Sequence, residues 1–149
     1  MRFRYHMTRV GQPALTLGGR WVRPQPLIHV SLIGPTNARP ILGILDTAAD
    51  DTVFPDYMAA RIGLDLTAGP TGSAAGMGGV PILLRYGQVK LRVAGGGEFR
   101  EWPALVGFTS VPLRYPMLGF GGFLRFFRSV FHGDLEEVEL VVNSLHPGT

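Results

Sequence analysis

The segment ILGILDTAADDT, residues 41–52, is the most informative part of this 149-residue chain. An apolar, β-prone run ends at Leu45, and Asp46 follows it directly, before small residues and further hydrogen-bonding side chains. A carboxylate at the end of a buried strand is costly unless the next turn stabilises it, and chains accept such a cost where the group performs chemistry. The plainer interpretation is a strand that ends in an Asx-type turn. The segment alone leaves both interpretations open.

Three motifs, taken in order, favour the chemical interpretation. Residues 46–52 read DTAADDT, residues 76–79 read GMGG, and residues 115–119 read YPMLG. They resemble the active-site loop, the glycine-rich flap tip and the hydrophobic-hydrophobic-Gly signature of the retropepsin family of aspartic proteases. The resemblance spans roughly residues 26–131. It implies an all-β, retropepsin-like closed β-barrel of the acid-protease fold, one lobe per chain, with one or two short helices, the second of them at residues 122–131.

The same resemblance assigns roles to individual residues. Asp46 is implied as the catalytic carboxylate, supported in its loop by Thr47, Ala48 and Ala49. Ala48 replaces the family's glycine; it keeps the backbone N–H that bonds the carboxylate, and its methyl group strains the loop only where the local φ is positive. The residues implied to contact substrate are Asp50, Asp51, Gly76, Met77, Gly78, Gly79 and Met117. The plainer alternatives are a pair of solvated turn carboxylates and an ordinary flexible hairpin loop.

A single Asp-Thr motif determines the expected assembly. Aspartic protease chemistry needs two carboxylates that share one proton, because two like charges so close together cannot both ionise. The ionised carboxylate acts as general base on a water, and the protonated one polarises the scissile carbonyl. Asp50 and Asp51 lie too near Asp46 in sequence to face it across a water. We therefore expect a homodimer in which the Asp46 residues of two subunits meet across a two-fold axis.

One departure from the family concerns the position after Gly119. The family places an arginine there, which braces the aspartate corresponding to Asp50, whereas this chain has Phe120. Asp50 therefore needs another cation or stays exposed, and we expect a rewired interface rather than a missing one. The candidate cations are Arg23, Arg125 and Arg128.

The pattern along the chain predicts one β-rich domain over residues 26–145, preceded by an arm or short leading hairpin over residues 1–25 around Gly18-Gly19. Alternating apolar residues predict a half-buried strand at residues 27–33, and Met58, Ile62 and the stop at Gly63 predict a short helix. Other strands are expected at 80–84, 89–93, 99–108 and 137–143, with turns near 86–87 and 94–97 and with Pro103 at an edge or bulge. The two tryptophans, Trp21 and Trp102, are expected in the core.

Composition narrows the possible functions. The net charge of +3 comes from scattered arginines, so a clustered nucleic-acid surface is not expected. The chain has no cysteine, which excludes disulfides and thiolate chemistry and is compatible with the cytoplasmic location that we expect. No apolar run approaches the roughly 18 residues that span a bilayer, and we expect no secretory signal. The four histidines have no metal-type spacing, so neither a metal nor a cofactor is expected.

The sequence therefore predicts a homodimeric aspartic endopeptidase that cuts peptides in an extended conformation. One alternative is a retropepsin-fold module without catalysis that binds extended peptides as an added strand. The other is a structural β-domain in which Asp46 only caps a turn.

Overall fold

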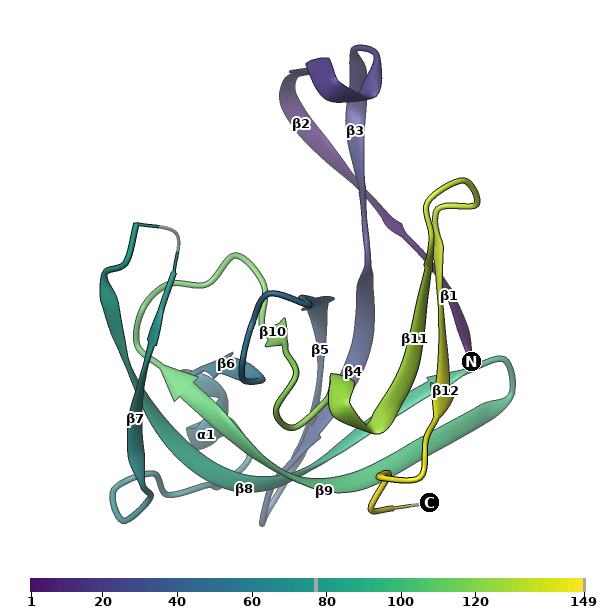
Figure 1. The fold of residues 1–149 in the computed structure, drawn as a ribbon. Helices are drawn as coiled ribbons and strands as arrows, with labels where there is room; N and C mark the ends of the chain where they lie inside the picture. Colours follow the sequence, from purple (N-terminus) through teal and green to yellow (C-terminus); the bar gives the residue numbers. More distant parts are fainter. Residues whose placement is uncertain (77, 149) are drawn as a thin grey trace.

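A closed β-barrel forms the body of the protein (Figure 1). The computed structural model describes residues 1–76 and 78–148. Among these residues, six strands pair in a ring that closes where the first pairs with the last. In ring order the strands are β4 (Leu27–Ile33), β5 (Ala38–Leu45), β10 (Met117–Leu118), β6 (Val53–Pro55), β9 (Glu98–Thr109) and β8 (Pro81–Gly95). A seventh strand, β7 (Thr71–Ala75), extends the sheet beyond β8. The expectation of an all-β barrel is confirmed.

The first two barrel strands match the sequence pattern. In β4, Ile28, Val30 and Leu32 are buried, and His29 between them is exposed. β4 pairs antiparallel with β5 along its whole length. Because β5 ends at Leu45, Asp46 is the first residue after a strand that lies inside the barrel wall.

Aromatic side chains fill one end of the barrel core. Trp102 of β9 is only 1% exposed, and its indole N–H donates to the carbonyl of Gly122 at 2.9 Å. The rings of Phe123 and Phe127 each lie 5.3 Å from it. The expectation for Trp102 is confirmed. The expectation for Trp21 is wrong, because its side chain is 61% exposed on β3 (Arg20–Gln25), outside the barrel.

The expected turn near Tyr86-Gly87 is wrong, because β8 runs through it without interruption. Tyr86 and Gly87 pair in register with β9. Gly87 has a packing role: a Cβ at this position would lie 2.6 Å from the side chain of Leu64. The glycine therefore allows Leu64 to lie close against this barrel strand, and it does not reverse the chain. The turn expected at 94–97 is present, with Gly96 and Gly97 at positive φ between β8 and β9.

One of the two expected helical segments forms an α-helix. α1 (Tyr57–Arg61) is a single short helix that follows β6, and Gly63 at φ +73 takes the chain out of it. The helix expected at residues 122–131 is wrong. That segment holds only the 3₁₀ turn η2 (Leu124–Phe126), and the strand β11 (Phe127–His132) follows. β11 pairs with β12 (Glu137–Val142) along its full length, so cross-strand pairing overrides the helical spacing of the phenylalanines.

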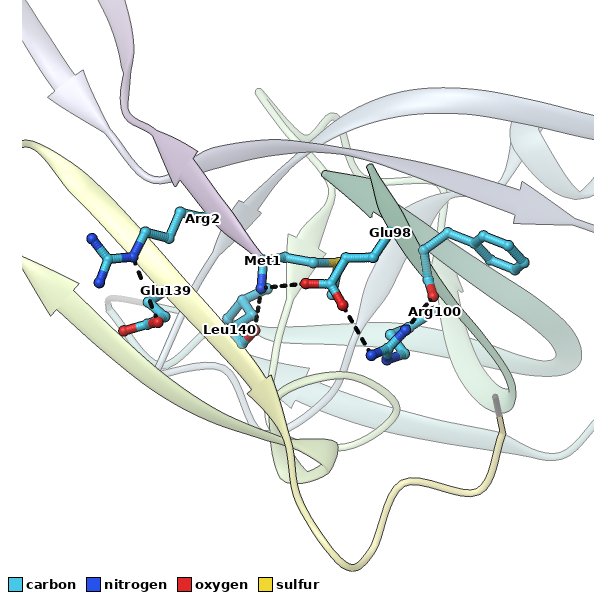
Figure 2. A network of polar contacts seen from close by, with 7 residues as sticks. Met1, Arg2, Glu98, Arg100, Glu139 and Leu140 are labelled. Atoms are coloured by element: carbon cyan, nitrogen blue, oxygen red, sulfur yellow. Dashed lines mark hydrogen bonds and ion pairs between the residues drawn. The ribbon is translucent and has the colours of Figure 1, made fainter. Parts of the chain in front are cut away.

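A second sheet, of order β1–β12–β11, pairs the first strand of the chain with its last two strands. β1 (Arg2–Arg4) pairs antiparallel with β12. Figure 2 shows how this sheet joins the β8–β9 hairpin: the Met1 ammonium donates to the carbonyl of Leu140 at 3.0 Å and lies 3.1 Å from a carboxylate oxygen of Glu98. Arg100 donates to the other oxygen of Glu98 at 2.9 Å.

A hairpin stands apart from both sheets. β2 (His6–Ala14) and β3 form a two-stranded sheet of their own, with the 3₁₀ turn η1 (Leu15–Leu17) at its tip and Gly18 and Gly19 at positive φ. We call residues 6–25 the arm. It projects away from the barrel (Figure 1), and Arg20 forms an ion pair with Glu136 in the turn between β11 and β12. The arm lies within residues 1–25, where an arm or short leading hairpin is expected.

Candidate active site

Asp46 lies at the point where β5 leaves the barrel wall. Its backbone N–H donates to the carbonyl of Leu118 at 3.2 Å, and its Oδ1 accepts the N–H of Ala48 at 2.9 Å. Asp46 itself is half-buried, whereas Thr47 and Ala48 are exposed. The turn thus holds one oxygen of the carboxylate by a charge-assisted hydrogen bond, while the side chain keeps some access to solvent.

Alanine at position 48 fits this loop without backbone strain. Glu136 is the only non-glycine residue in the described part of the chain with a positive φ, so Ala48 does not adopt the left-handed conformation. The N–H that the resemblance assigns to this position is present and bonded to Asp46. The methyl group therefore adds bulk at the surface of the loop but requires no unusual φ.

Two of the three sequence motifs lie side by side in the structure. Strand β10 is inserted between β5 and β6, so Met117 pairs parallel with Ile44 and antiparallel with Val53. The residues after β10 continue along the Asp46 loop. Phe120 donates its N–H to the carbonyl of Ala49 at 2.9 Å. In three further main-chain bonds the N–H of the first residue donates to the carbonyl of the second: Asp46 to Leu118 (3.2 Å), Gly121 to Asp50 (2.7 Å) and Thr52 to Gly121 (2.8 Å).

Gly119 permits this close contact between two main chains. A Cβ at this position would lie 2.3 Å from the carbonyl oxygen of Asp51 and 2.7 Å from that of Ala49. No side chain fits at such distances. The glycine of the YPMLG motif is therefore required by the packing of the loop itself.

Asp50 and Asp51 have different surroundings. Asp50 is exposed, and among the described residues it forms no ion pair with Arg23, Arg125 or Arg128. Asp50 is therefore exposed in the single chain.

Asp51 is half-buried, and its Oδ2 accepts the hydroxyl of Tyr86 at 2.6 Å. Burial, then the hydrogen bond and the negative charge of Asp51, raise the pKa of Tyr86 to about 12. One oxygen of a residue expected to contact substrate is thus already engaged within the chain.

Tyr86 is the residue of this region that the sequence pattern did not identify. Its neighbour Gly87 suggested a turn, which hid the fact that the tyrosine lies on a continuous strand. The burial pattern of β8 changes phase here, because Tyr86 is half-buried and the next residue, Gly87, is buried. The available signal in the sequence was a polar aromatic residue at this point.

The glycine-rich motif forms the tip of the hairpin between β7 and β8. Gly76, Gly78 and Gly79 are exposed, and the last two have positive φ. The N–H of Gly79 donates to the carbonyl of Gly76 at 3.0 Å. Met77, also expected at this tip, lies outside the described residues. Figure 1 shows the tip at the same end of the barrel as the loop after β5, although no hydrogen bond between described residues joins the two.

Within residues 1–76 and 78–148, no group of three or more His, Cys, Asp or Glu side chains is placed to hold a metal ion. The helical residues in these same ranges include no segment of the length and apolar character needed to cross a membrane. The loop after β5 presents the half-buried carboxylate of Asp46, with Oδ1 bonded to the turn, at the same end of the barrel as the hairpin tip (Figure 1).

No protein-family model matches this chain, and none of the curated proteins matches it either.

Proposed function

We propose that this protein is a retropepsin-like aspartic endopeptidase that works as a homodimer. The observation that carries the proposal is the state of Asp46. Its carboxylate stands half-buried at the end of a barrel strand, with Oδ1 fixed by the N–H of Ala48 and its backbone fixed by Leu118. A carboxylate whose orientation is set by the main chain is suited to act as an acid or base.

The mechanism requires a second copy of the same loop. Each chain supplies one Asp46, and two such carboxylates close together share a single proton. The ionised carboxylate then removes a proton from a water between them. The protonated one donates a hydrogen bond to the scissile carbonyl, so that the water attacks its carbon. In the tetrahedral intermediate that results, a carboxyl proton passes to the nitrogen, the C–N bond breaks, and the product carboxylic acid and amine leave.

The substrate would be a peptide in extended conformation. The hairpin between β7 and β8 ends in the exposed glycines Gly76, Gly78 and Gly79, and Met117 lies half-buried beside the Asp46 loop. Backbone groups recognise an extended chain by hydrogen bonds that do not depend on its side chains. The location that we propose is the cytoplasm, with which a sequence without cysteine is compatible.

Cleavage of an unfolded protein between about pH 3.5 and 7.5 tests the proposal, because a shared-proton dyad gives an acid-leaning profile. We expect turnover by the wild type and none by Asp46→Asn. Asp56→Asn is the matched control, since Asp56 is an exposed aspartate that makes no side-chain capping bond to α1, and it is expected to keep full activity.

Circular dichroism establishes that Asp46→Asn is folded. Equal activity of Asp46→Asn and the wild type would refute the proposal. A folded, dimeric wild type without turnover on several substrates would point instead to the peptide-binding module, in which Asp46→Asn keeps peptide affinity.

A further inference from the structure

The arm lacks a partner within its own chain. Its two strands pair with one another and, in the described residues, with no other strand. An isolated two-stranded hairpin is marginally stable in water. One ion pair connects the arm to the body: it joins Arg20, the first residue of β3 after the tip turn, to Glu136 in the turn between β11 and β12, and the arm extends away from the barrel (Figure 1).

Large apolar side chains on the arm face solvent. Leu15 at the tip is 87% exposed, Trp21 is 61% exposed and Met7 is 41% exposed. A hollow of about 420 Å³ on the arm is lined by Arg9, Val10, Trp21 and Val22. Concentrated apolar exposure of this kind, on a segment rimmed by charge, marks a surface that binds another protein.

The charge of the arm identifies what that protein is. Residues 1–45 contain six arginines and neither aspartate nor glutamate. Residues 46–65, which follow directly, contain five aspartates and a single arginine. Arg9 and Arg23 of the arm are exposed and form no ion pair among the described residues, and Asp50 of the loop is exposed in the same way. A second copy of this chain presents the acidic loop that complements the arm.

The dimensions allow the arm to reach that loop. β2 has nine residues, which corresponds to about 30 Å of extended chain, whereas a globular domain of this size has a radius of gyration of about 15 Å. The arm and the Asp46 loop lie at the same end of the barrel (Figure 1). If two copies bring their Asp46 loops together at this end, each arm is long enough to extend over the other copy.

We propose that the arm is a clasp for a second copy of the chain, with Trp21 as its apolar anchor and with Arg9 and Arg23 against the second copy's acidic loop. The inference rests on the proposed function in one respect, namely that the Asp46 loops of two copies face each other. It goes beyond that function because it names the segment that holds the dimer together.

Sedimentation equilibrium at several protein concentrations tests the clasp. Truncation of a buried aromatic anchor weakens an interface by tenfold or more, so we expect Trp21→Ala to raise the dimer dissociation constant at least tenfold. The double variant Arg9→Glu/Arg23→Glu is expected to do the same. Phe99→Ala is the matched control, because Phe99 is 53% exposed at the β8–β9 hairpin, away from the arm; its dissociation constant should stay at the wild-type value.

Tryptophan fluorescence gives a second readout on the unmodified protein. Trp102 is buried already, so a shift to shorter wavelength with rising concentration reports burial of Trp21. A monomeric wild type, or a dissociation constant unchanged in both arm variants, overturns the clasp. Both readouts measure association alone. A dimer that depends on the arm but does not cleave peptides would therefore contradict the proposed protease and leave the clasp standing.

Discussion

Replacing Tyr86 by phenylalanine tests how Asp51 is held. The hydroxyl of Tyr86 donates to Asp51 Oδ2 at 2.6 Å and so connects strand β8, at the base of the β7–β8 hairpin, to the candidate active-site loop. The ring has a separate role: it packs against Gly72, where a Cβ would lie 2.8 Å from Tyr86 Cε2. Phenylalanine keeps this packing and removes one hydroxyl, so the variant isolates the hydrogen bond.

The expected loss of stability follows from the type of bond. A hydrogen bond to a charged group contributes about 1.5–3 kcal/mol. Both side chains are only half-buried, so water replaces part of the lost interaction and we expect about 1–1.5 kcal/mol. For a domain of this size, each kcal/mol of unfolding free energy that is lost lowers the melting temperature by about 2–4 °C. The melting temperature of Tyr86→Phe should therefore fall by about 2–6 °C.

The pH dependence of this difference has a definite sign. The pKa of Tyr86 rises from 10.0 to about 12 in the folded protein, first because of burial and then because of the bond to Asp51 and its charge. Because the folded value exceeds the unfolded one, the stabilisation is fully present below pH 10 and is lost as the pH rises through 12. The wild type should thus lose its greater stability over Tyr86→Phe as the pH rises from 10 to about 12.

Urea denaturation of both proteins between pH 7 and 12 measures the difference. Asp51→Asn serves as a second variant, because it removes the charge but keeps the tyrosine; the pKa of Tyr86, followed by its ultraviolet absorbance, should fall. Equal stability of Tyr86→Phe and the wild type at pH 8 would refute the assignment. So would a stability difference that stays constant up to pH 12.

Two further substitutions test the packing and the electrostatics. Gly119→Ala places a Cβ 2.3 Å from the carbonyl oxygen of Asp51, so thermal denaturation should show a loss of about 1–3 kcal/mol; Gly76→Ala, with no atom within 4 Å, is the control and should be neutral. Glu98→Gln removes the carboxylate whose pKa is lowered from 4.5 chiefly by the Met1 ammonium. A lowered pKa gives stability that is present above pH 4.5 and lost on acidification below it. The denaturation curves of the wild type and Glu98→Gln should therefore converge at low pH. A difference in stability that persists there would count against the ion pair.

Local pattern predicted much of the barrel. Strand β4 follows the alternation of Ile28, Val30 and Leu32, because one face of the strand packs into the core and the other faces solvent. The end of β5 before Asp46 could be predicted for a similar reason: an apolar run stops where a polar turn begins. Hairpin glycines such as Gly96 were also visible, because positive φ favours glycine.

The remaining features depend on contacts between distant parts of the chain. Phe123 and Phe127 are spaced as on one face of a helix, yet pairing with β12 makes the second of them the start of a strand. Gly87 resembled a turn residue because its neighbour in space, Leu64 in the loop between α1 and β7, cannot be read from the local sequence. Trp21 was expected in the core, since an apolar residue on an unpartnered hairpin gives no local sign of its exposure.

The Asp46 loop obtains its shape from its own chain. Leu118 accepts from Asp46, Ala49 accepts from Phe120 and Asp50 accepts from Gly121, all through the main chain. None of these bonds needs a second copy, so a partner has only to supply a second carboxylate. The proposed dyad would then form from two loops that are already ordered, and the free energy of association would not be spent on folding them. In the proposed dimer, the control of assembly would then lie outside the loop, on a segment such as the arm.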